Sequence, residues 1–170
     1  MEFQLKQARL RPWLPSDVEA LVKHANNRKI WRNLTDGFPH PYTLADARAY
    51  VGTATRSETT FAIEVVGEAA GSIGLEVQTD VYSRGALIGY WLSEAYWGRG
   101  IMTAAVQVVT AYGFSHLNLA RISAAIYAWN LPSMRVLEKA GYHLEGRRHK
   151  AVTKDGQTID DVMYAIVRPE

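Results

Sequence analysis

Cysteine is absent from this chain of 170 residues. Its absence excludes disulfide bonds and thiolate chemistry, and it removes the commonest structural zinc sites, which use cysteine ligands. The five histidines are scattered along the chain without the spacing of a metal site. We therefore expect no metal.

Long apolar runs are also lacking. The first residues, MEFQLKQARLRP, do not form the apolar stretch of a signal peptide, and no segment approaches the length of a membrane span. A strong charge of one sign is missing too, because 19 lysines and arginines face 17 acidic residues and leave a net charge of +2. Nucleic-acid-binding modules have a much larger basic excess. We expect a cytoplasmic protein with neither a membrane nor a nucleic acid as partner.

The length allows one sizeable core but not comfortably two, so a single domain over residues 1–170 is expected. Periodicity and turn signals predict the order β-α-α-β-β-β-α-β-α-β-β. This order indicates an α+β fold, with a mixed, mostly antiparallel central sheet flanked by helices. Gly141 should end the last helix, and residues 154–156 should form the last hairpin turn. The strands are expected at residues 3–11, 60–66, 70–77, 87–92, 121–127, 142–153 and 158–167.

Capping boxes, in which two side chains three positions apart bond each other's backbone N–H groups, mark two early helices. The pairs are Ser16 with Glu19 and Thr43 with Asp46. The second helix would bury the stripe Leu44, Ala47 and Val51. Between the boxes, residues 26–42 are too rich in prolines and aromatic rings for an idle linker. We expect this segment to cover the core or to line a pocket.

Acidic residues are absent from residues 95–137, while four basic residues lie in that segment. A polyanionic ligand would be attracted by such a field. Near its start, Gly98 and Gly100 separate an apolar strand from an amphipathic helix. Glycines let backbone N–H groups approach a ligand closely, and a helix N-terminus adds unsatisfied donors and a partial positive charge. The residues predict a pyrophosphate site. The four basic residues are Arg99, His116, Arg121 and Arg135.

Two common nucleotide motifs do not fit this glycine turn. A mononucleotide P-loop requires a lysine, and none follows Gly100. A dinucleotide fingerprint requires a third glycine where Thr103 stands, and an acidic residue about twenty positions later. One simpler alternative stays open, in which the glycines serve only the packing of a strand–turn–helix connection.

Four blocks occur in order: IGYWLSEAYWGRGIMTAA (88–105), NLPSMRVLEKAGY (130–142), LEG (144–146) and DGQTIDDVMYAI (155–166). Together they resemble the GCN5-related N-acetyltransferases (GNAT), in particular the RimJ/RimL-like ribosomal-protein N-terminal acetyltransferases. The resemblance covers nearly the whole chain. It implies the GNAT fold and a co-substrate, acetyl-coenzyme A.

The resemblance also assigns the cofactor residues. The strand end at Leu92 and Ser93 would pair with the amides of the pantetheine arm, and Asn130 matches a residue that contacts this arm. Asn130 could instead be a plain helix N-cap. We place Ser133 and Arg135 at the cofactor as well. The pyrophosphate would bind backbone amides within Trp97, Gly98, Arg99, Gly100, Ile101, Met102 and Thr103.

The chain departs from the family pattern at several positions. Trp97 replaces the usual Gln or Arg, and Met102 replaces Gly or Ala, although backbone donors are unaffected. Leu137 replaces the tyrosine that protonates the leaving thiolate in many members. Many relatives carry Glu where Leu87 stands and Arg where His149 stands, so both changes would reshape the acceptor site.

In RimL-like members a serine protonates the thiolate, and Ser133 occupies its position. Helical spacing places Ser133, Leu137 and Ala140 on one face, so Ser133 can point where the missing tyrosine would. The general base is unresolved, and deprotonation through water is equally acceptable. The candidate bases are Glu94, Glu145, His149, Asp160 and Asp161.

The acceptor pocket is expected in the segment between the early helices. Its apolar rings could shield the reaction from water, while Asp36 attracts a cationic amine. Alternatively, Phe38 and Tyr42 merely pack over the two helices. The predicted pocket residues are Asn33, Asp36, Phe38, His40, Tyr42 and Trp91.

These expectations combine into an enzyme that transfers an acetyl group directly from acetyl-coenzyme A to a primary amine, with a protein N-terminus as the first choice of acceptor. A small-molecule amine, such as an amino acid, a polyamine or an antibiotic, is the alternative acceptor. A catalytically silent acyl-coenzyme A-binding module is a third possibility, motivated by Leu137. The assembly is expected to be a monomer or a homodimer.

Overall fold

The computed structural model describes residues 1–170, which divide into two compact units. The first unit contains Met1–Gly74 and Tyr90–Ala105, and the second contains Leu75–Gly89 and Val106–Glu170. Two strands and one helix contribute residues to both units. They are β4 (Glu68–Val77), β5 (Gly85–Leu92) and α4 (Ile101–His116).

The sheet of the first unit is antiparallel from β1 to β4. Its other strands are β1 (Phe3–Gln4), β2 (Arg9–Arg11) and β3 (Thr60–Val65). The end of β5 follows β4 in this sheet, because the Ser93 N–H donates to the Ala70 carbonyl at 2.8 Å. The single strand predicted over residues 3–11 is wrong. The chain turns where the Leu5 N–H bonds the Ala8 carbonyl, and the two halves pair with each other.

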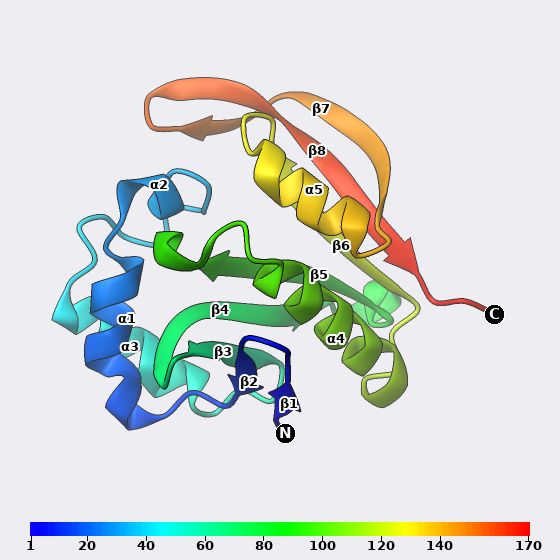
Figure 1. The fold of residues 1–170 in the computed structure, drawn as a ribbon. Coiled ribbons are helices and arrows are strands. Elements are labelled where there is room, and N and C mark those ends of the chain that lie inside the picture. The colour runs from blue at the N-terminus through cyan, green and yellow to red at the C-terminus, as the bar shows by residue number, and fades with distance from the viewer. The chain divides into compact units, whose positions relative to one another are not determined.

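Three helices complete the first unit: α1 (Val18–Ala25), α2 (Arg28–Trp31) and α3 (Leu44–Ala54). Helices α1 and α3 lie side by side (Figure 1) and bury a shared apolar core. The second capping box is confirmed, because Thr43 and Asp46 bond each other's N–H groups at 2.8 and 3.2 Å. Its predicted stripe is partly wrong, since Leu44 is exposed and Ala54 is buried instead. The short helix α2 was not predicted.

The first predicted capping box is wrong. Ser16 lies inside a short 3-10 turn over Pro15–Asp17 that precedes α1, and no side chain caps α1. The carboxylate of Asp17 instead accepts two bonds from the Arg11 guanidinium, both 2.8 Å long, and one from the Leu14 N–H. Asp17 therefore combines a buried ion pair to β2 with a local bond at the start of the 3-10 turn.

The second unit contains the strand order β5-β6-β8-β7. Its remaining elements are β6 (Arg121–Tyr127), α5 (Leu131–Lys139), β7 (His143–Lys154) and β8 (Gln157–Val167). Strand β5 runs parallel to β6, and the other pairs are antiparallel, as the predicted mixed sheet requires. The β5–β6 ladder ends at the pair Leu87–Ser123, although β6 stays paired with β8 as far as Tyr127.

Two predicted chain reversals are confirmed in this unit. Gly141 follows α5 with φ +93°, and Asp155 and Gly156 have φ +53° and +72° at the tip of the long β7–β8 hairpin (Figure 1). Both positions need the left-handed conformation that glycine and aspartate tolerate best. No helix in the structure has the length and apolar character needed to cross a bilayer.

Candidate functional site

The glycine loop, residues 93–100, joins β5 to α4 in the first unit. Gly98 and Gly100 have φ +71° and +75°, and a Cβ atom added at either would meet no heavy atom within 4 Å. Backbone conformation, rather than close packing, therefore requires these glycines. The first α-helical bond of α4 runs from the Ala104 N–H to the Gly100 carbonyl at 3.1 Å. The N–H groups before Ala104 have no carbonyl of their own helix to bond, as at any helix start.

Three other segments of the first unit hold the glycine loop. The Ser93 hydroxyl bonds His24 of α1 at 2.9 Å. The Glu94 carboxylate accepts bonds from Asn27 and Lys29, which flank the start of α2. The third segment is the β1–β2 turn, whose Gln7 side chain bonds the Arg99 carbonyl. Together these contacts fix both ends of the loop.

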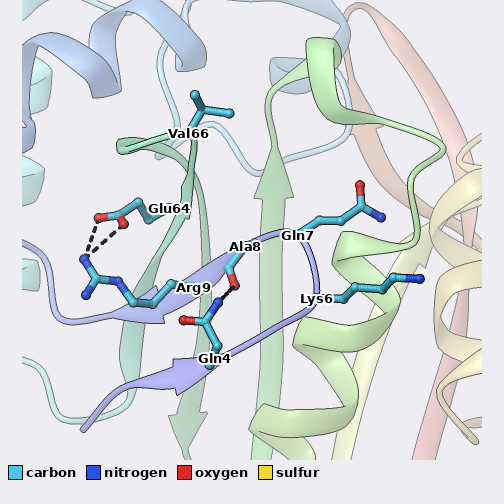
Figure 2. Close-up of a pocket in the computed structure, with 7 residues that line it drawn as sticks. All are labelled: Gln4, Lys6, Gln7, Ala8, Arg9, Glu64 and Val66. Carbon is cyan, nitrogen blue, oxygen red and sulfur yellow. Dashed lines mark hydrogen bonds and ion pairs between the residues drawn. The ribbon is translucent and has the colours of Figure 1, made fainter.

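Residues of the β1–β2 turn line a polar hollow of about 320 Å³ (Figure 2). On one side of the hairpin, Arg9 and Glu64 form an ion pair, with Arg9 Nη2 3.0 Å from Glu64 Oε1. Lys6 and Gln7 extend on the opposite side, where Gln7 Nε2 donates to the Arg99 carbonyl at 3.2 Å. The hairpin thus contacts the glycine loop directly. The hollow is lined by Gln4, Lys6, Gln7, Ala8, Arg9, Glu64 and Val66.

Main-chain groups at the end of β5 are already partly engaged. The Leu92 carbonyl accepts a bond from the Trp97 indole N–H at 2.7 Å, while the Ser93 N–H is bonded to Ala70 of β4. Because successive residues of a strand point their polar groups to opposite edges, the Leu92 N–H faces away from β4. The role of Leu92 and Ser93 in pantetheine binding stays a prediction. The indole bond is a feature of Trp97 that the sequence did not indicate.

Aromatic rings gather in the segment predicted to form the acceptor pocket. The Phe38 ring lies 4.9 Å from Tyr42 and 5.7 Å from Trp91, measured between centroids. The His40 ring lies 5.8 Å from Trp31 of α2. The structure thus brings Phe38, Tyr42 and Trp91 together.

The other predicted pocket residues lie differently. Tyr42 belongs to the core between α1 and α3, and this burial raises the pKa of its hydroxyl, so its packing agrees with the simpler alternative. Asn33 donates from its side chain to the Lys29 carbonyl within α2 and the turn after it, and Asp36 is exposed. Their roles in acceptor binding stay predictions.

In the second unit, Asn130 precedes α5 as its N-cap, and its side-chain oxygen accepts the Ser133 N–H at 3.4 Å. The N-cap interpretation of Asn130 is therefore confirmed, and cofactor binding by the same residue stays a prediction. Ser133, Leu137 and Ala140 are all buried, which confirms the predicted shared face. Leu137 is completely buried, so the position of the missing tyrosine belongs to the core, while Arg135 is exposed.

Two of the candidate bases are exposed carboxylates with cationic partners. Hydrogen bonds from Lys29 and Asn27 lower the pKa of Glu94. In the second unit, a bond from Arg121 lowers the pKa of Glu145. A carboxylate with a lowered pKa is a weaker base, because its charged form is stabilised. Neither glutamate has the environment of a strong base.

The remaining candidates lie on the β7–β8 hairpin. Bonds from the Lys150 N–H, Arg147 and His149 lower the pKa of Asp160 to about 2. His149 is almost fully exposed, with its Nδ1 atom 3.1 Å from Asp160. Asp161 is buried and paired with Arg148, whose Nε atom lies 2.8 Å from Asp161 Oδ1. Each candidate carboxylate thus has a cationic partner, and His149 contacts Asp160.

The sequence analysis missed a buried histidine at the glycine loop. His24 Nδ1 lies 2.9 Å from Ser93 Oγ, and His24 Nε2 lies 2.9 Å from Glu68 Oε2. One signal was available: His24 stands beside Ala25 and one turn after Leu21, on the apolar face of α1. A chain of three polar side chains therefore meets the start of the loop.

Comparison with known proteins gives one consistent result. Residues 7–143 match the model of the acetyltransferase (GNAT) domain family. The probable N-acetyltransferase YjcK of Bacillus subtilis (strain 168) is 50% identical over 85 residues, or 50% of this chain. That match spans 47% of YjcK, so the chain matches about half the length of this curated relative.

Two further similarities extend over most of the chain. The spermidine N(1)-acetyltransferase of Escherichia coli (strain K12) is 28% identical over 93% of this chain and 84% of its own length. Among solved structures, Mycobacterium smegmatis RimJ in complex with CoA-disulfide superposes with a TM-score of 0.82 at 26% identity, covering 94% of this chain and 81% of RimJ.

Proposed function

Because the chain belongs to the GNAT acetyltransferase family, we propose that it is an N-acetyltransferase that moves an acetyl group from acetyl-coenzyme A directly to a primary amine. The acceptor we favour is the α-amino group of a protein N-terminus. The observation that carries the proposal is the glycine loop, where two left-handed glycines precede the N-terminus of α4 with open space around them. Such a loop suits a diphosphate, because its N–H groups and the helix dipole both favour negative charge.

The residues at this loop fit acetyl-coenzyme A. Backbone N–H groups from Trp97 to Thr103 would bind the pyrophosphate. The Leu92 N–H, which faces away from β4, would donate to the thioester carbonyl and stabilise the oxyanion that develops there. Ser133, on the buried face of α5, would protonate the leaving thiolate.

The charge state of the candidate bases supports an α-amino acceptor. An α-amino group has a pKa of about 8 and is partly neutral at pH 7, whereas a lysine side chain near 10.4 needs a strong base. The pKa values of Glu94, Glu145 and Asp160 are all lowered by their partners. A site with such weak bases suits an amine that loses its proton easily.

A polyamine acceptor is the second candidate function, favoured by the similarity to spermidine N(1)-acetyltransferase over 93% of this chain. The amines of a polyamine are more basic than an α-amino group, so this acceptor would need one of the candidate bases to act. A third candidate, a silent acyl-coenzyme A-binding module, is favoured by Leu137, which fills the position of the usual acid in the core.

A thiol-release assay with purified protein separates these functions. N-terminal peptides, spermidine and free amino acids would be compared as acceptors at fixed acetyl-coenzyme A. We expect release with peptides and little with the other amines. Thiol release with spermidine but not with peptides would favour the polyamine as acceptor. If none of the amines produces thiol release, the silent module is favoured.

The role of Ser133 has its own test. Ser133→Ala should lower kcat by about 100-fold or more, since the loss of a general acid typically costs that much, while the Kd for acetyl-coenzyme A stays unchanged. Ser115→Ala removes a hydroxyl that bonds only within and beside α4, and is the matched control. Equal kcat values for the two variants would exclude Ser133 as the acid.

A further inference from the structure

His24 is a buried titratable residue that the proposed mechanism does not use. It stands on the last turn of α1, and only 7% of its side chain is exposed. Both ring nitrogens have partners at 2.9 Å, Ser93 on one side and Glu68 on the other. A buried imidazole with two specific partners has a fixed position and orientation.

Glu68 sets the hydrogen-bond direction in this chain. Bonds from Lys23 and His24 lower the pKa of Glu68, so its carboxylate is ionised at neutral pH and can only accept. The Nε2 atom of His24 must therefore carry a proton. In the neutral imidazole the other nitrogen, Nδ1, is then an acceptor, and the Ser93 hydroxyl donates to it.

Ser93 is the residue at which β5 ends and the glycine loop begins. Its N–H bonds the Ala70 carbonyl, and its own carbonyl accepts the Tyr96 N–H at 3.0 Å. A serine before a helical turn often caps that turn with its hydroxyl, but no such bond exists here. The hydroxyl is held by His24 instead, and the His24 ring also lies beside the Tyr96 ring, with a centroid distance of 6.2 Å.

Resting on the proposed function, we propose that His24 is a positioning residue for acetyl-coenzyme A. Its Nδ1 atom fixes Ser93, and with it the junction at which β5 passes into the loop that binds the diphosphate. Glu68 acts one step further away, by holding the imidazole in the tautomer that accepts from Ser93. The contact with Ser93, rather than the link between α1 and β4, is what matters for the cofactor.

Two amide substitutions separate these two contacts. An asparagine amide reaches about as far as Nδ1, so His24→Asn keeps a partner for Ser93 and loses Glu68. A glutamine amide reaches about as far as Nε2, so His24→Gln keeps Glu68 and loses Ser93. We expect His24→Gln to raise the Kd and KM for acetyl-coenzyme A by about three- to tenfold, the usual value of one hydrogen bond, with kcat little changed.

Affinity would be measured by calorimetry on the full chain, with a thermal melt to establish folding. His24→Asn should bind like the unmodified protein. Ser93→Ala should weaken binding as much as His24→Gln does, and the double variant should lose no more than either single one. His116→Gln is the matched control, because His116 also bonds a serine, at 2.7 Å, but at the end of α4.

The outcomes distinguish the two proposals. If the unmodified protein does not bind acetyl-coenzyme A, the proposed function fails and this inference fails with it. If it binds, but His24→Asn is impaired as much as His24→Gln, or neither is impaired, His24 has only a structural role. If His24→Gln does not fold, Ser93→Ala decides, and an unchanged Kd for that variant overturns the inference.

Discussion

The Arg11–Asp17 ion pair of the first unit is buried, whereas the polar pairs on the β7–β8 hairpin of the second unit largely face solvent. The side chains of Arg11 and Asp17 are 5% and 7% exposed, and that of His149 is 82% exposed. Both regions pair a cation with a carboxylate, so residue type does not separate them. Burial does, because a charge removed from water depends on its partner, while an exposed pair is screened. Residues of one chemical type therefore contribute unequally to stability, and substitutions can measure the difference.

Breaking the buried pair should have the largest effect. Asp17→Asn removes the charge that faces Arg11 and weakens two bonds of 2.8 Å. We expect the free energy of unfolding to fall by about 3 kcal/mol, as for other buried pairs that lose one partner. Urea unfolding would measure it. Arg147→Ala, on the exposed hairpin, is the control and should leave the midpoint nearly unchanged. Equal shifts would contradict the comparison.

Lowering the pH should remove the stabilisation that Glu64 gains from its ion pairs with Arg11 and Arg9. Hydrogen bonds from Arg11 and Arg9 lower the pKa of Glu64 below its usual 4.5 in the folded protein. The resulting stabilisation is complete above the unfolded pKa and is lost as the pH falls through the lower folded pKa. Glu64→Gln should therefore be clearly less stable than the unmodified protein at pH 7 and differ progressively less below pH 4.5. Unfolding curves across this range would measure the gap, and a constant gap would exclude the assignment.

The smallest effect is expected at His149. Its exposed ring contacts Asp160, so His149→Ala should shift the melting temperature by less than about 2 °C and leave kcat for peptide acceptors unchanged. The thiol-release assay and a thermal melt would measure both. A tenfold loss of kcat without loss of stability would identify His149 as the base, and exposure would then be a poor guide to function in this protein.

Local signals in the sequence predicted much of the fold. The capping box at Thr43, the end of α5 at Gly141 and the strand β6 were found because each depends on a few neighbouring residues. The box at Ser16 failed because the chain is already helical there, in a 3-10 turn whose Asp17 bonds both the Leu14 N–H and Arg11 of β2. A local sequence pattern cannot reveal the tertiary contact with Arg11.

The candidate site likewise contains features that the sequence predicted and features that it did not. The glycine loop was predictable, since its left-handed residues, Gly98 and Gly100, leave a mark in the sequence. The chain of His24, Glu68 and Ser93 was not, because its members lie 44 and 69 positions from His24 and meet only when α1 packs near β4 and β5. The bond from the Trp97 indole to the Leu92 carbonyl was also missed, although the two residues are only five positions apart, because it depends on how the loop turns back on the end of β5.

The β1–β2 turn reaches the glycine loop through Gln7, 92 positions before Arg99. With the contacts of His24 and Glu94, this leaves the loop preorganised, and a preorganised loop gives up little conformational entropy when a ligand arrives. The N-terminal hairpin is therefore part of the ligand's surroundings. Truncations or affinity tags at that hairpin act on the loop as well as on the edge of the sheet.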